Sequence, residues 1–248
     1  MATLTIESSV TERSSERTRE HLFFSGIAGL IALVVFIGFA RTYYLAGLFD
    51  AKPLAAPIVH VHGAVFTCWL VLLVVQTSLI GTGHGAVHRK LGLVAFALAP
   101  LVVLLGIVVA LEMLKRFAVV PTVDSPLIFA VALSEITGFA VPTFFALRFR
   151  RRPSFHKRLI VIGTIAMTTA GFGRWPVALL LHNPLPAMLA AFTLLLSVMA
   201  FDLWSTRRLH PATIWGSLWV VLIELGAFAL GHTDAWHSLA VHIRALTS

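Results

Sequence analysis

A four-residue motif, a histidine followed by two basic residues and a leucine, occurs twice in this sequence. The first copy is the HRKL of residues 88–91, and the second is the HKRL of residues 156–159. Imidazole nitrogens bind haem iron and divalent metal ions, and they exchange protons near neutral pH. The repeated histidines, His88 and His156, are therefore the first candidates for ligands of a shared group.

Each copy of the motif follows a long apolar run and a basic turn, and each opens a further long apolar run. This pattern predicts a repeated helical hairpin at the centre of the chain. A parallel repeat would bring His88 and His156 to one membrane face, opposite one another across a pseudo-two-fold axis. We interpret this pair as an inner cofactor site. The alternative interpretation is that each basic motif only contacts anionic lipid headgroups at the inner end of a helix.

Three further histidines, His60, His62 and His182, lie toward the other ends of the apolar runs. His62 and His182 form a second candidate cofactor site, on the outer side. His60 and His62, together with the carboxylate of Glu135, are candidate ligands of a divalent metal ion. Because residues two apart on a helix point in divergent directions, at most one of these two histidines is expected to bind the ion.

Three charged residues, Glu135, Arg174 and Glu224, fall deep inside apolar runs. A charge at the centre of a spanning helix costs roughly 2.5–3.5 kcal/mol on insertion scales, so each needs a partner or a function. Counted along their helices, the three lie at similar depths, slightly outside the midplane. We predict that Arg174 pairs with Glu135 or Glu224. Such a cluster would either fix the helix packing or form a polar site that opens to the outer face.

The composition restricts the class of protein. Of the 248 residues, 58% are hydrophobic and 12% are charged, and the mean hydropathy is +0.90. A soluble domain cannot bury so much apolar surface, so we predict an all-α, polytopic membrane helix bundle. Because a spanning helix needs about 20 apolar residues, about seven transmembrane helices are expected. Their ranges are 21–40, 57–80, 91–113, 126–147, 159–181, 185–204 and 213–230.

Lysine and arginine are concentrated in the regions that an N-inside arrangement places on the cytoplasmic side. By the positive-inside rule, the chain is predicted to run N-inside/C-outside across a bacterial inner membrane. The net charge of +8 then reflects this bias. It does not indicate nucleic-acid binding, because the basic residues lie beside membrane ends. The expected partners are membrane lipids, including anionic headgroups at the inner face.

No linker divides the chain, so one membrane domain is expected. Residues 1–20 are predicted to form a polar cytoplasmic tail, residues 21–230 the seven-helix domain, and residues 231–248 a short amphipathic segment on the outer surface. The single cysteine, Cys68, excludes a disulfide framework and a cysteine-rich metal site. A retinal protein is also excluded, because no lysine lies in a predicted span to form a Schiff base.

Part of this motif pattern resembles a family of bacterial multi-pass membrane proteins that has no assigned activity. The resemblance runs from the second to the fifth predicted span and is carried by His62-Gly63, Gln76, residues 88–92, Gly106, residues 148–152, residues 156–158 and Arg174. The pattern is more distantly similar to haem-bearing cytochrome b and ferric-reductase-type bundles, which also keep histidines at helix ends near basic turns. The chain departs from that pattern because its fourth predicted span contains no histidine.

From the residues and the resemblance together, we predict a redox or metal-associated inner-membrane protein, with haem b or a divalent metal ion as its cofactor. A stacked two-haem arrangement fits poorly, because His156 and His182 are 26 residues apart, which is roughly 39 Å of helix. The alternative functions are a proton-coupled small-solute transporter and a non-catalytic subunit of a membrane complex. The sequence leaves open whether the protein is an enzyme.

Overall fold

The computed structural model describes residues 2–49 and 56–247, and for residues 2–17 it describes the backbone only. Every element of this part is a helix, so the predicted all-α class is confirmed. The α-helices are α1 (Ala2–Phe39), α2 (Pro57–Gly81), α3 (Gly85–Phe117), α4 (Ser125–Arg148), α5 (Pro153–Ala166), α6 (Thr169–Phe172), α7 (Pro184–Thr206), α8 (Pro211–Gly231) and α9 (Asp234–Leu246). A π-helical turn, η1 (Ala40–Tyr44), and a short 3-10 helix, η2 (Ala46–Leu48), follow α1.

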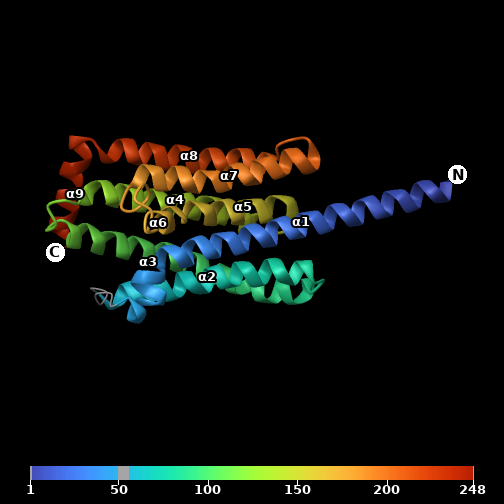
Figure 1. The fold of residues 1–248 in the computed structure, drawn as a ribbon, viewed down its shortest axis with the longest axis horizontal. Coiled ribbons are helices and arrows are strands. Elements are labelled where there is room, and N and C mark those ends of the chain that lie inside the picture. The colour runs from blue at the N-terminus through green and yellow to red at the C-terminus, as the bar shows by residue number, and fades with distance from the viewer. Residues whose placement is uncertain (1, 50–55, 248) are drawn as a thin grey trace.

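Six of these helices are long and apolar enough to cross a membrane, judged over the residues that the structure describes. They are α1, α2, α3, α4, α7 and α8, and they coincide with six of the predicted spans to within a few residues at most ends. They lie lengthwise beside one another, as expected of a multi-pass membrane protein (Figure 1). We call the end with the α2–α3, α4–α5 and α7–α8 turns the inner end, after the predicted orientation, and the opposite end the outer end.

The fifth predicted span, residues 159–181, is not one continuous helix. α5 ends at Ala166 and α6 is only four residues long, with tight turns between and after them. The helix tightens there, because the amide of Thr168 donates to the carbonyl of Ile165, three residues back, at 2.8 Å. Pro176 has no amide hydrogen and opposes any return to a helix. α5 and α6 still carry the chain from the inner end toward the start of α7 (Figure 1), so the count of seven crossings stays a prediction.

Glycines let this interrupted segment pack tightly against its neighbours. A Cβ atom on Gly163 of α5 would lie 2.8 Å from the hydroxyl oxygen of Thr143 on α4, which is closer than real side chains approach. A Cβ atom on Gly38 of α1 would overlap the backbone of Gly171 on α6. The segment is therefore held by α4 on one side and by α1 on the other, although it is not a continuous helix.

The chain is helical close to both ends. α1 begins at Ala2, so the predicted polar tail is the first part of this helix from residue 2 onward, and it projects beyond the bundle (Figure 1). α9 lies across the outer end, where Trp236 stacks on Phe129 of α4 with ring centroids 5.8 Å apart. The indole of Trp236 also donates to the carbonyl of Pro126 at 2.7 Å. The outer amphipathic segment is thus a helix packed on the bundle, and its contact with lipid stays a prediction.

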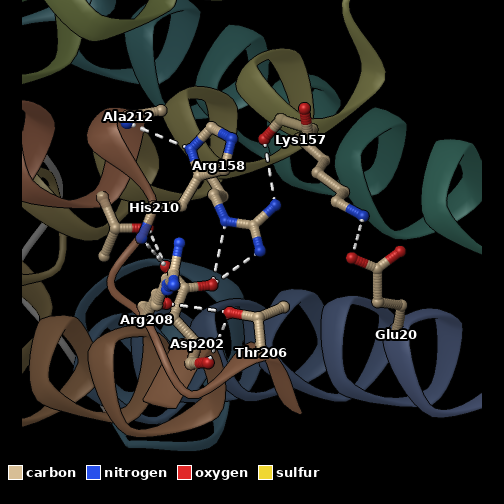
Figure 2. Close-up of polar contacts among 10 residues, drawn as sticks. Glu20, Lys157, Arg158, Asp202, Thr206, Arg208, His210 and Ala212 are labelled. Atoms are coloured by element: carbon tan, nitrogen blue, oxygen red, sulfur yellow. Dashed lines mark hydrogen bonds and ion pairs between the residues drawn. The ribbon is translucent and has the colours of Figure 1, made fainter. Parts of the chain in front are cut away.

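A buried ion pair joins three helices at the inner end (Figure 2). The guanidinium of Arg158 on α5 donates to Oδ1 of Asp202 on α7, through Nε at 2.9 Å and Nη2 at 2.6 Å. The second oxygen, Oδ2, accepts from the Thr213 hydroxyl at 2.5 Å and from the His210 amide at 3.1 Å. Arg158 is 2% exposed and Asp202 is fully buried. The start of α5 is therefore tied to α7 and α8 two residues after His156.

This pair leads to a prediction for stability. The change Asp202→Ala leaves Arg158 buried without its carboxylate, which should lower the free energy of unfolding by about 3–5 kcal/mol. The matched control is Glu20→Ala, which removes the partner of Lys157 from a 2.5 Å ion pair whose side chains are 25% and 33% exposed. A pair of that kind contributes at most about 1 kcal/mol. Equilibrium unfolding in mixed detergent micelles measures both variants, and equal losses would contradict the importance of burial.

The predicted orientation is tested by cysteine labelling in a Cys68→Ser background. Thr82 lies in the turn between α2 and α3 at the inner end, and Ser238 lies on α9 at the outer end, and both are exposed. Thr82→Cys should react with a membrane-impermeant maleimide only from the cytoplasmic side, and Ser238→Cys only from the other side. If both react from the same side, α5 and α6 do not complete a crossing.

Candidate functional site

The two motif histidines lie next to each other at the inner end of the bundle. His88 is in the first turn of α3, and His156 is in the first turn of α5. Their ring centroids are 6.5 Å apart, and the ring planes are nearly perpendicular, at 82°. The α2–α3 hairpin and the α4–α5 hairpin therefore each contribute one histidine to the same region of the inner end. That the hairpins superpose as repeats stays a prediction.

Both rings are held by the same kind of hydrogen bond. The Nδ1 atom of His88 lies 3.3 Å from the carbonyl oxygen of Gln76 on α2. The Nδ1 atom of His156 lies 2.9 Å from the carbonyl oxygen of Ala146 on α4. A carbonyl oxygen can only accept, so Nδ1 donates in each ring and carries the proton. The Nε2 atom of a neutral ring is then left as the metal-binding atom, which is how an outer hydrogen bond commonly orients a metal-binding histidine.

The protonation state of His156, which precedes the fifth predicted span, favours the same role. Burial lowers its pKa, the hydrogen bond to the Ala146 carbonyl opposes this effect, and the nearby His88 lowers the pKa again. The ring is therefore neutral at neutral pH. A neutral imidazole with its proton on Nδ1 offers a lone pair at Nε2.

A cavity of about 350 Å³ opens beside the two rings, between the two hairpins. Its walls are mainly apolar and include Trp69, Leu72, Leu73, Phe96, Leu147 and Ile160. Its rim carries the exposed guanidinium groups of Arg89, Arg150 and Arg151. One buried polar atom that lines it, Oε1 of Gln76, has no hydrogen-bond partner among the described residues. Apolar walls with a basic rim suit a ligand that has an apolar body and acidic groups at one edge.

The spacing of the rings fits a single metal ion between them. Two imidazoles on opposite sides of one ion, each bound through Nε2 at about 2.0–2.1 Å, would place their ring centroids roughly 6.4 Å apart, close to the 6.5 Å found here. A structural divalent ion needs further protein ligands. No group of three His, Cys, Asp or Glu side chains gathers in the described part of the chain. Haem iron needs only two axial ligands from the protein, because the porphyrin supplies the others.

The predicted outer metal site does not form among the described residues, and the predicted outer cofactor pair, His62 and His182, stays a prediction. His62 stacks on Phe66 of its own helix, with ring centroids 6.3 Å apart, and its buried Nδ1 atom has no hydrogen-bond partner among the described residues. His182 is exposed in the turn before α7, and His60 is exposed near the start of α2. Over residues 2–49 and 56–247, no metal-binding group forms from His60, His62 and Glu135. Residues two positions apart on one helix point in different directions, so His60 and His62 of α2 diverge.

Arg174 does not form the predicted direct ion pair, whereas Glu135 and Glu224 are both buried. The side chain of Arg174 is exposed, its guanidinium lies 4.5 Å from the centroid of the Phe39 ring, and Nη1 donates to the carbonyl of Ala170 at 2.6 Å. It interacts electrostatically with Glu135, yet no nitrogen–oxygen distance within 4.0 Å joins it to a carboxylate of the described residues. The interrupted helix explains why the ion pair is absent. Arg174 lies in a turn after α6, so its side chain does not point in the direction that a continuous helix would give it.

The sequence pattern did not reveal the partnership of Arg158 with Asp202. Arg158 belongs to the second basic motif, and Asp202 lies near the inner end of the sixth predicted span, residues 185–204. A carboxylate inside an apolar run needs a partner. This rule, which singles out Glu135, also indicates the pair. Applied to Asp202, that argument points to the basic residues at the same end of the bundle.

Comparisons of this chain with protein-family models, with curated proteins and with solved structures find no match. The resemblance drawn from the motif pattern therefore stays a prediction.

Proposed function

We propose that this chain is a b-type haem protein of the membrane, with His88 and His156 as the axial ligands of one haem near the inner end. The observation that carries the proposal is the pair of rings 6.5 Å apart, each of which donates Nδ1–H to a backbone carbonyl. Axial ligation by side chains, hydrogen bonding around the ligands and burial are the means by which proteins hold and tune haem. Two of these features support the proposal, because each ring is hydrogen-bonded through Nδ1 and both rings are half-buried.

The cavity beside the rings supports the same proposal. A porphyrin is a flat apolar ring, which suits walls built from Trp69 and Phe96. Its two carboxylates would lie at the rim, where the guanidinium groups of Arg89 and Arg150 can pair with them. A volume of about 350 Å³ is toward the small end of ligand sites, which span roughly 300–1,000 Å³. The cavity would therefore enclose only part of a porphyrin, and Leu93, which lines it, is 69% exposed.

The chemistry that such a group supplies when bound is one-electron transfer. With His88 and His156 both holding such a group, no position would be left for oxygen or a substrate, so electron transfer would be favoured over oxygen chemistry. The residues of the chain orient the ligands, exclude water with apolar walls and surround the acidic edge with positive charge. We therefore infer an electron-carrying membrane protein whose redox centre lies close to the inner surface.

The ligand assignment is tested by absorbance spectra of the purified wild type and of single variants, produced with haem supplied during expression. The wild type should show a Soret band and, after reduction, the sharp visible bands of a low-spin b-type haem. His88→Ala and His156→Ala should each lose the low-spin spectrum. His84→Ala is the matched control, since His84 is exposed one turn before His88 and its Nδ1 lies 3.0 Å from the Thr82 hydroxyl. A colourless wild type, or equal loss in His84→Ala, would contradict the proposal.

The basic rim leads to a prediction for the redox potential. Positive charge near the haem carboxylates favours the reduced form, so Arg150→Gln should lower the midpoint potential by roughly tens of millivolts. The matched control is Arg148→Gln, because Arg148 is exposed at the end of α4 and does not line the cavity. Potentiometric titration followed by absorbance gives both values. An unchanged potential in Arg150→Gln, or an equal decrease in the control, would contradict the place assigned to the carboxylates.

A further inference from the structure

A second feature, independent of the histidine pair, is a fully buried carboxyl group on α8. Glu224 is 0% exposed. One of its oxygens, Oε2, accepts a hydrogen bond from the Thr169 hydroxyl of α6 at 3.3 Å. The other oxygen, Oε1, is buried and has no hydrogen-bond partner among the described residues. An ionised carboxylate left in this state would be strongly destabilising, so this group needs a proton or another partner.

The unpaired oxygen of Glu224 points toward α4, where a second carboxyl group lies. A Cβ atom added to Gly138 of α4 would lie 3.8 Å from Oε1 of Glu224. Glu135 is three residues before Gly138, on the same face of α4, and is 7% exposed. The two carboxyl groups are close enough to interact electrostatically.

The packing of α4 against α8 places both groups at the same level. The indole of Trp219 on α8 donates to the carbonyl of Thr137 on α4 at 3.3 Å. Toward the outer end, a Cβ atom on Gly231 of α8 would lie 2.6 Å from Cδ1 of Leu127 on α4. In an antiparallel pair with these two contacts, Glu224 of α8 lies beside the turn of α4 that precedes Thr137, which contains residue 135.

The positive charge near Glu135 and Glu224 is not sufficient to neutralise two carboxylates. Arg174 interacts with Glu135 but forms no ion pair with it, and His62 from the α2 side interacts with Arg174. Neither approaches Glu224 in the contacts of the described residues. Two buried carboxyl groups that share one site cannot both ionise readily, because like charges repel strongly away from water. One of the pair is therefore expected to hold a proton.

We propose that Glu135 and Glu224 form a proton-binding site in the outer half of the bundle, in which one exchangeable proton is shared between the two carboxyl groups. The site lies at the break between α5 and α6, since its hydroxyl donor, Thr169, is the first residue of α6. Interrupted helices at membrane depth are where membrane proteins place sites for protons and other small cations. A proton suits the site better than Na⁺, because the contacts supply only one hydroxyl oxygen besides the two carboxyl groups.

Infrared spectroscopy of the purified protein tests this proposal, because a protonated carboxylic acid has a C=O stretch that a carboxylate lacks. At neutral pH the wild type should show such a band, and it should move on transfer to D₂O as the shared proton exchanges. Glu224→Gln should weaken and shift the band, because it removes one of the two carboxyl groups that share the proton. Glu112→Gln, which alters a half-buried carboxyl group on α3, is the matched control and should retain it. A wild type without the band would overturn the proposal.

A second variant and a second cation separate the alternatives. Thr169→Val removes the hydroxyl donor to Glu224, so the band should shift in frequency without loss of intensity, even if Glu224→Gln is poorly folded. An unshifted band in Thr169→Val would overturn the assignment to Glu224. Loss of the wild-type band on addition of NaCl, but not of choline chloride, would overturn the choice of a proton and assign the site to Na⁺. The infrared readout does not require haem, so it is independent of the proposed function.

Discussion

The buried pair between Arg158 and Asp202 is the contact on which the inner half of the structure depends. A buried ion pair is tolerated only when its geometry is good and its remaining polar atoms are bonded. Here both oxygens of Asp202 are hydrogen-bonded. Oδ1 accepts from Arg158, and Oδ2 accepts from the Thr213 hydroxyl and the His210 amide. The short helix α5 is fixed by this contact although it is not a full span. The same contact sets the position of His156, two residues earlier.

The cavity follows from the way in which the two hairpins meet. Toward the outer end α3 and α4 are in close contact, since a Cβ atom on Gly106 would lie 3.1 Å from Ile136. Toward the inner end the hairpins are separated by the cavity, and His88 and His156 lie next to each other in its wall. The hydrogen bonds from these rings to the carbonyls of the preceding helices keep the ring orientations fixed. Close packing at the outer end therefore leaves a cavity at the inner end.

The sequence was sufficient for the features that depend on apolar length and on repetition. Six long helices follow from hydropathy, and the pairing of His88 with His156 follows from a motif that occurs twice in matching contexts. The interruption after Ala166 could not be predicted from the apolar run. Hydropathy indicates how long an apolar segment is, but it does not show the tight turns that glycine and proline allow within it. The position of Arg174 depends on that interruption, so the predicted direct pair with a carboxylate is absent. Asp202 lies close to the end of an apolar run, so hydropathy does not mark it as a charge inside a span.

The central claim, one haem held by His88 and His156, is tested most directly by electron paramagnetic resonance of the oxidised wild-type protein. The two rings are nearly perpendicular, at 82°. Perpendicular imidazole planes leave the two iron d-orbitals that interact with the rings, dxz and dyz, almost equal in energy, so the account predicts a low-spin ferric signal of very high anisotropy. The signal should disappear in His156→Ala. A high-spin ferric signal, the less anisotropic signal of parallel rings, or the absence of any haem signal in haem-supplied protein would contradict the account.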